Sequence, residues 1–217
     1  MRYWSRGIGG DEMPWNRETE EPGGRIPAPG ELAIVQAFLN SVDLEDRIER
    51  FDTPAHLAQW LIDRGLLAPT ATLGDEDVER VTAVREALRD LLTPHSGGPI
   101  AADARGRLHR GLGAAELTVQ FAEDGRPDLA PVAAGVDGAL ARIMAIVYRA
   151  SVDGAWQRLK TCRNDVCRWA FYDASKNRSS AWCTMAICGS QRKARAYRQR
   201  KPRKAKLPSD RQSFDRK

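Results

Sequence analysis

The chain has 217 residues, of which 42% are hydrophobic, so it is long and apolar enough for one medium domain and a small module. No stretch approaches the roughly 18 uninterrupted apolar residues that a membrane helix needs. The N-terminus lacks the apolar region of a secretory signal. We therefore expect a cytoplasmic protein, a compartment in which stable disulfides are rare.

Charge is divided unevenly along the chain. Residues 1–154 hold 16 Arg, no Lys and 25 acidic residues, a net charge of −9. Residues 155–217 hold 18 Lys and Arg against four acidic residues, a net charge of +14. A segment this basic favours contact with a polyanion, whereas the acidic part is typical of an ordinary soluble domain.

Residues 1–29 are rich in Gly, Pro and charge, and we expect them to form a flexible arm. Apolar residues then recur at the spacing of one helix face from residue 31 to residue 39. A second helix is predicted from Pro54, because Asp52 or Thr53 can cap it and proline is favoured in a first helical turn.

Further elements follow up to the cysteines. A third helix is predicted after Gly74, with three acidic residues at its positive end and Pro94 closing it. A shorter helix is expected at 101–112. The stretch 117–132 alternates apolar and polar residues around the turn signal EDGRP, which predicts a β-hairpin. A long helix is expected from about Val136 to Leu159, with Gly154 as a residue that can interrupt it.

All four cysteines lie close together, as two C-x4-C pairs separated by 15 residues: Cys162 and Cys167, then Cys183 and Cys188. Zinc prefers four thiolates in a tetrahedron, and two loop-borne pairs supply that arrangement. In a regular α-helix, residues five apart lie about 140° apart around the axis, so the second pair must straddle a turn. We expect a structural zinc ion, with no coordination position left for a catalytic water.

The residues around the cysteines fit this interpretation. Gly189 offers backbone freedom, and Ser190 can cap a helix that starts there. Trp169, Phe171 and Trp182 can form a miniature core that needs the metal to fold. Two disulfides and four inert buried thiols are the alternatives that the cysteine count alone leaves open.

The stretch DGAWQRLKTCRNDVCRWAFYDASKNRSSAWCTMAICGSQRKARAYRQR resembles the C-terminal zinc finger of the bacterial CGNR family. Upstream, LNSVDLED, LAQWLIDRGLL and VREALRDLL resemble the ABATE-type domain that accompanies this finger. The resemblance covers residues 31–201 and implies a DNA-binding transcription regulator. The chain departs from the family motif at Ser190 and Gln191, where that motif has Asn and Arg.

A cationic run follows the second cysteine pair and predicts a basic helix with no face to bury. Such a helix either stays solvated or meets a polyanion, and a zinc module that holds it favours DNA. Sequence-specific binding does not follow from charge alone. The candidate nucleic-acid-binding residues are Arg192, Lys193, Arg195, Arg198, Arg200 and Lys201.

By resemblance, the N-terminal domain can sense a small molecule. Asn40, Trp60 and Arg85 are the candidate ligand-binding residues, and their alternative role is packing and hydrogen bonding between helices. The three histidines are scattered, and no phosphate loop or nucleophile motif is present. We therefore expect that the protein is not an enzyme.

The sequence predicts an α+β fold, with a mainly helical N-terminal domain, a small β-hairpin and a treble-clef-like four-cysteine zinc module that leads into a basic helix. The expected parts are an arm at 1–29, an ABATE-like sensor or dimerisation domain at 30–154, a CGNR-like finger at 155–201 and a disordered basic tail at 202–217. The function hypothesis is a zinc-dependent DNA-binding regulator, with a small-molecule effector and a homodimer as further expectations. The alternative is a protein-interaction or RNA-binding adaptor that uses the zinc module as a scaffold.

Overall fold

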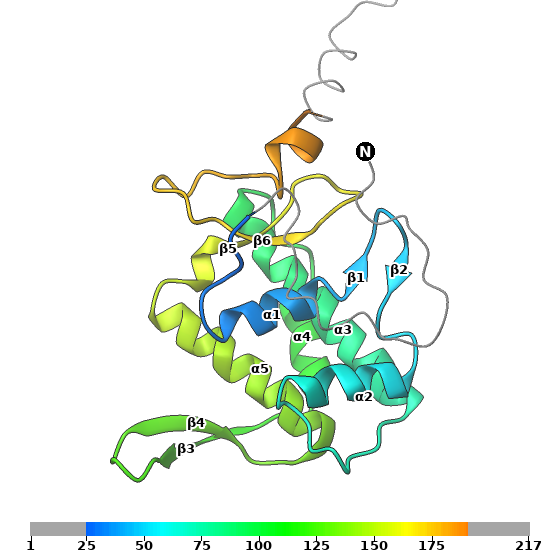
Figure 1. Ribbon diagram of the computed structural model, residues 1–217, viewed down its shortest axis with the longest axis vertical. Coiled ribbons are helices and arrows are strands. Elements are labelled where there is room, and N and C mark those ends of the chain that lie inside the picture. The colour runs from blue at the N-terminus through cyan, green and yellow to red at the C-terminus, as the bar shows by residue number, and fades with distance from the viewer. Residues whose placement is uncertain (1–24, 191–217) are drawn as a thin grey trace, which may run out of the picture.

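Helices and short hairpins make up the part of the chain that the structure describes. This computed structural model describes residues 25–190 (Figure 1). The predicted basic helix and tail lie outside the described residues, as does the predicted arm up to residue 24. Within the described range, no helix is both long and apolar enough to cross a lipid bilayer.

Five α-helices and three antiparallel hairpins form the fold of residues 25–190, which confirms the α+β class. The helices are α1 (Leu32–Leu39), α2 (Pro54–Asp63), α3 (Asp75–Leu92), α4 (Ala104–Leu112) and α5 (Gly135–Val152). The hairpins pair β1 (Val42–Asp43) with β2 (Ile48–Glu49), β3 (Leu117–Phe121) with β4 (Pro127–Pro131), and β5 (Leu159–Thr161) with β6 (Ala170–Tyr172). Short helical turns are η1 (Thr93–Ser96), η2 (Trp156–Arg158) and the π-helical turn η3 (Met185–Gly189).

The helix starts follow local capping chemistry. The Thr53 hydroxyl accepts a hydrogen bond from the backbone N–H of His56, at 3.2 Å, and so caps α2 as expected. At the start of α3, the Asp77 carboxylate accepts from the backbone N–H of Gly74, at 2.9 Å. Both predicted helices are confirmed.

Two expected helix boundaries were wrong, and one hairpin was not predicted. The last helix ends at Val152 rather than Leu159, because Gly154 takes a left-handed φ of 73° and turns the chain. The chain then forms η2 and β5 instead of a further helical turn. The fourth helix begins at Ala104 instead of Ala101, and the two-residue strands β1 and β2 were not predicted.

The zinc-module hairpin shares the main hydrophobic core. This core gathers fully buried residues of α1, α3 and α5, among them Phe38, Leu88 and Ile143. Leu159 of β5 and Ala170 of β6 belong to the same cluster and are both 0% exposed. Figure 1 shows β5 and β6 at one end of the helices and the β3–β4 hairpin at the opposite end. The core therefore continues from the helices into the segment that carries the cysteines.

Two buried polar side chains fix this hairpin to the helices. The Asn40 amide donates to the carbonyl of Ala170 and accepts from its backbone N–H, both at 2.8 Å. Arg89 is 0% exposed, and its guanidinium donates to the carbonyl of Leu39 and, at 2.9 Å, to that of Arg168. Because buried backbone groups need partners, these two side chains join α1 and α3 to the cysteine-bearing segment.

We predict that Asn40→Ala lowers the free energy of unfolding by about 1 to 3 kcal/mol, because the buried N–H of Ala170 loses its partner and the Ala170 carbonyl keeps only the longer contact with the Gln36 amide, at 3.4 Å. Urea denaturation followed by circular dichroism measures the change. The control is Asn177→Ala at an exposed position, which should stay within about 0.5 kcal/mol of the unaltered protein. Equal stability of the two variants would contradict the role of Asn40.

Candidate metal centre

The first cysteine pair lies on a tight loop between β5 and β6. The backbone N–H of Cys162 donates to the carbonyl of Trp169 at 2.9 Å, which closes the base of the loop. At its tip, the N–H groups of Cys167 and Arg168 both donate to the carbonyl of Asn164 at 2.9 Å. Arg168 takes a left-handed φ of 48°, so the loop folds back and both thiols point the same way.

The second pair is brought together by the π-helical turn η3. The backbone N–H of Gly189 donates to the carbonyl of Thr184 at 3.1 Å, which is the five-residue closure of a π-helix. Because this turn is wider than an α-helical turn, residues five apart come close to one face. The Sγ atoms of Cys183 and Cys188 lie 3.5 Å apart. The chain does not form a regular α-helix here, in agreement with the prediction that the second cysteine pair straddles a turn.

One expectation about this turn was wrong. Gly189 does not take a left-handed φ within this turn; instead, a Cβ at this position would lie only 2.9 Å from the Met185 sulfur. The Ser190 hydroxyl donates to the carbonyls of Met185, at 3.1 Å, and of Ala186, and the helix that it is expected to cap lies outside the described residues.

The four sulfur atoms converge on one point. All four Sγ atoms lie within 4.8 Å of one another, and three of the four residues are buried. The Sγ separations are 3.5 Å for Cys183–Cys188 and 3.7 Å for Cys167–Cys183. Both are much longer than the roughly 2.05 Å of an S–S bond, so neither pair forms a disulfide. Both separations match the sulfur–sulfur distance of about 3.8 Å in a tetrahedral site with zinc–sulfur bonds of about 2.3 Å. The geometry can therefore hold a metal ion with four sulfur ligands.

Polar and aromatic neighbours support the sulfur cluster. The Asn164 amide donates to the Cys188 sulfur at 3.5 Å, a contact typical of the groups that orient metal ligands. Phe171 is 0% exposed and packs with Trp169 and Trp182 against the cysteines, which confirms the expected miniature core. Arg25 donates to the carbonyls of Cys183 and, at 2.7 Å, Trp182, and its guanidinium lies 4.5 Å from the centre of the Phe171 ring.

A buried ion pair lies beside the cluster. Lys160 and Asp173 have side chains that are 3% and 0% exposed, and the Lys160 Nζ lies 2.8 Å from an Asp173 Oδ2. Burial alone would raise the pKa of Asp173. Hydrogen bonds from Lys160, Ser175 and Ser180 outweigh this effect and hold the pKa of Asp173 well below its ordinary value.

The candidate ligand-binding residues have internal partners. Trp60 is buried in an aromatic group, with its ring 5.4 Å from that of Phe51. Arg85 forms a two-point contact with the Glu49 carboxylate, at 2.7 and 2.6 Å. Burial raises the pKa of Glu49, but the Arg85 hydrogen bonds overcome this and lower it. Trp60 and Arg85 both lie against Phe51, whereas Asn40 binds β6.

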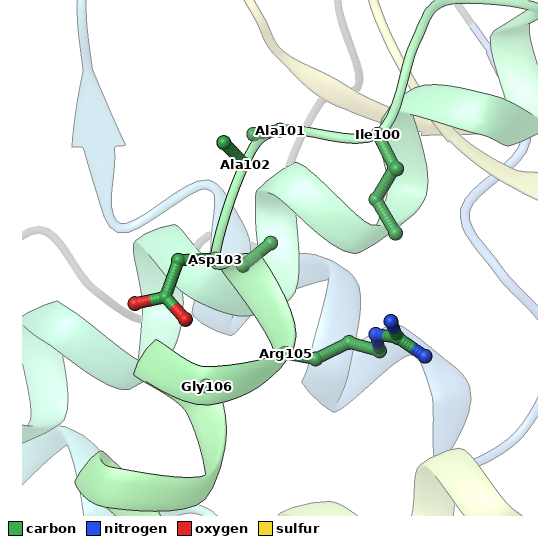
Figure 2. Close-up of a pocket in the computed structure, with 7 residues that line it drawn as sticks. Ile100, Ala101, Ala102, Asp103, Arg105 and Gly106 are labelled. Atoms are coloured by element: carbon green, nitrogen blue, oxygen red, sulfur yellow. The ribbon is translucent and has the colours of Figure 1, made fainter.

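A hollow on the surface offers no convergent polar groups. It is lined by one stretch of chain, residues 100–106, at the start of α4. Figure 2 shows the Asp103 carboxylate and the Arg105 guanidinium extending in different directions from this stretch. Asp103 forms a salt bridge with Arg110 at 2.6 Å. This hollow therefore lacks the features of a ligand site.

The six candidate nucleic-acid-binding residues lie outside the described range. Several residues that support the sulfur cluster were not predicted from the sequence. The pattern Asp173-x-Ser175 is a usable signal, because an aspartate often accepts hydrogen bonds from the residue two positions later. Lys160 and Asn164 carry no such signal, since their partners lie on other segments. Arg25 lies in the segment that the sequence predicts to be a flexible arm, so its contacts with the second cysteine pair were not expected.

We predict that Asp173→Asn lowers the free energy of unfolding by about 3 to 5 kcal/mol, because it leaves the buried Lys160 ammonium unpaired. The loss should be constant from pH 8 to about pH 5. Asp173 has its lowered pKa only in the folded state, so the pair contributes fully above the unfolded pKa of about 3.9 and is lost as the pH falls below it.

The matched control for this prediction is Asp165→Asn, at an exposed position of the same module. Urea denaturation of both variants across the pH range measures the difference. A loss for Asp173→Asn no larger than that of the control would show that the pair adds nothing to the fold.

Comparison with known families agrees with the geometry. Residues 32–153 match the ABATE family, described as "Putative stress-induced transcription regulator", and residues 158–201 match the CGNR zinc finger. Neither description is that of an enzyme. A search of curated proteins finds no match. The two regions occur in the expected order, and all four converging cysteines lie in the second. The chain therefore belongs to the ABATE family and carries a C-terminal CGNR zinc finger.

Proposed function

We propose that the chain is a zinc-dependent DNA-binding transcription regulator. The observation that carries the proposal is the convergence of four sulfur atoms within 4.8 Å, directly before the cationic segment of residues 192–201. A metal ion held by Cys162, Cys167, Cys183 and Cys188 fixes the chain four residues before that segment begins. Zinc has a structural role here, because the protein fills all four tetrahedral positions.

The chemistry of the donor set favours zinc in particular. Four closely packed thiolates repel one another unless a cation neutralises them, and soft sulfur ligands in tetrahedral geometry suit zinc. The aromatic groups around the cluster limit water access and form too small a core to fold without a crosslink. Metal binding is therefore expected to contribute directly to the stability of the module.

The charge distribution supports DNA as the partner. Between Asp173 and Asp210 the chain has eleven Lys and Arg residues and no acidic residue. Neutralising phosphates releases counterions from a nucleic acid, so a segment of this kind binds nucleic acid with a strong salt dependence. The tight docking of β5 and β6 on α1 and α3 supports a role for the N-terminal domain in orienting the finger.

Regulation by an effector remains a prediction. Asn40 joins α1 to β6, so a ligand that displaced its contacts with Ala170 would loosen the zinc module. Trp60 and Arg85 lie farther along the same helical domain, around Phe51. A homodimer, a cytoplasmic location and the domain boundaries at 30, 155 and 202 stay predictions as well.

We predict that the protein purified without chelator contains one zinc ion per chain, and that Cys167→Ser or Cys188→Ser lowers the zinc content and the stability. Removing zinc should also change the near-ultraviolet circular dichroism of Trp169 and Trp182, and added zinc should restore it. Elemental analysis by mass spectrometry measures the metal. A metal-free protein with an unchanged spectrum would refute the proposal.

We predict that the zinc-loaded full chain binds duplex DNA with an affinity that falls linearly with salt on logarithmic axes. The triple variant Arg192→Gln, Lys193→Gln, Arg195→Gln should reduce the slope by about 0.9 for each phosphate that the protein no longer neutralises. Fluorescence anisotropy with labelled duplexes measures both quantities. The matched control removes three exposed arginines of the helical domain, Arg105, Arg110 and Arg126.

A parallel titration with single-stranded RNA distinguishes the alternative function. Preference for duplex DNA supports the regulator. Preference for RNA, or partner binding that survives neutralisation of the three basic residues, would favour the adaptor.

A further inference from the structure

A cationic loop lies next to the metal centre and has no role in the core. We call residues 174–179 the Lys176 loop; all six are exposed, and they include Lys176, Asn177 and Arg178. The loop follows β6 and leads within four residues to Cys183. In Figure 1, it lies at the same end of the molecule as the cysteine-bearing turn, far from the β3–β4 hairpin.

The Lys160 ammonium holds this loop from inside. Its three N–H groups have three acceptors: the Asp173 carboxylate at 2.8 Å, the Arg178 carbonyl at 2.5 Å and the Ser180 carbonyl at 3.2 Å. A lysine has three donors and no acceptor, so the buried ammonium is fully satisfied. It draws the backbone of the loop inward and leaves the side chains outside.

Asp173 closes the loop from the other side. Its carboxylate accepts from the backbone N–H and hydroxyl of Ser175, at 3.1 and 2.6 Å, before the loop tip. It also accepts from the N–H and hydroxyl of Ser180, at 2.9 and 3.0 Å, after the tip. Arg158 adds hydrogen bonds to the carbonyls of Asp173 and Ser175, both at 3.1 Å. One carboxylate thus fixes both ends of the exposed segment.

The loop backbone is held in a conformation that an arginine rarely adopts. Arg178 has a φ of 50°, in the left-handed region that side chains with a Cβ disfavour. Such a conformation persists only where surrounding contacts impose it, and here the Lys160 bond to the Arg178 carbonyl does so. The Arg178 side chain therefore extends from a fixed backbone.

The hydrogen bonds of Lys160 and Asp173 shape an exposed loop rather than a hydrophobic core. Replacing a buried ion pair by apolar residues is often neutral or stabilising, so stability alone does not account for Lys160 and Asp173. The loop that they shape buries none of its residues. Within residues 25–190, neither Lys176 nor Arg178 forms a salt bridge, and no acidic residue follows Asp173 in the chain before Asp210. Among the described residues, these two cations are thus unpaired and lie on a rigid support.

We infer that the Lys176 loop is a second DNA contact, which binds phosphates of the duplex beside the cationic segment 192–201. The inference rests on the proposed function. The backbone N–H of Arg163 donates to the carbonyl of Ala181 at 3.0 Å, which ties the chain between the loop and Cys183 to the first cysteine loop. The loop is therefore fixed relative to the sulfur cluster, and the cationic segment begins in the chain four residues after the last cysteine, Cys188.

The chemistry of the loop suits phosphate rather than base recognition. The Lys176 ammonium acts as a point charge, and the Arg178 guanidinium can bind two phosphate oxygens at once. Asn177 lies between them and adds a neutral donor. Contacts of this type fix the position of a protein on the duplex and carry no sequence information themselves.

The test is DNA binding by the zinc-loaded full chain carrying Lys176→Gln and Arg178→Gln. The slope of log affinity against log salt should fall by about 1.8, that is, about 0.9 for each of two phosphate contacts. The decrease in affinity should be similar for duplexes of different sequence. The charge-preserving pair Lys176→Arg and Arg178→Lys should retain the slope of the unaltered protein.

The matched control removes the same charge from the other side of the fold, with Arg110→Gln and Arg126→Gln at exposed positions. Zinc content and circular dichroism should be unchanged in all variants, because every altered side chain is exposed. If the unaltered protein binds DNA and the loop variant matches the control, the inference is overturned while the proposed function stands. If the unaltered protein does not bind DNA, both are overturned.

Discussion

The fold of the C-terminal module depends on one geometric constraint: four sulfur atoms from two chain segments meet within 4.8 Å. Each segment needs an uncommon backbone to satisfy it. The first uses a left-handed residue, Arg168, and the second uses the π-helical turn that ends at Gly189. Conformations of this kind cost free energy and are found where a site requires them. The chain between the two pairs is consequently a closed loop with little freedom.

The module and the helical domain share a single body of structure. Leu159 and Ala170 lie in the main core, and Asn40 and Arg89 satisfy backbone groups on the cysteine-bearing side. A finger joined by a flexible linker would move independently of its partner domain. Here, a change in α1 or α3 acts on the backbone next to Cys167 through hydrogen bonds that are shielded from water, where such bonds are strong.

Short sequence patterns predicted those elements whose formation depends on residues that are close together in the chain. The cap at Thr53, the acidic first turn of α3, the turn at EDGRP and the paired cysteines are all short-range patterns, and the corresponding elements are present. Gly154 is a local signal that can interrupt the last helix, but the apolar residues that continue beyond Val152 predict an end at Leu159. The π-helical turn, the Lys160–Asp173 pair and the contact of Asn40 with Ala170 depend on segments that meet only in the folded state, and no periodicity reports them.

The contacts of Arg25 extend the functional unit beyond the regions that the family matches define. Arg25 lies seven residues before the first matched residue, Leu32, yet it binds the carbonyls of Trp182 and Cys183 and covers Phe171. A chain trimmed to residues 32–201 would retain both matched regions but lose a guanidinium that braces the second cysteine pair. Work on the isolated family region would thus describe a weakened finger, and the natural upstream sequence belongs in any fragment chosen for biochemical study.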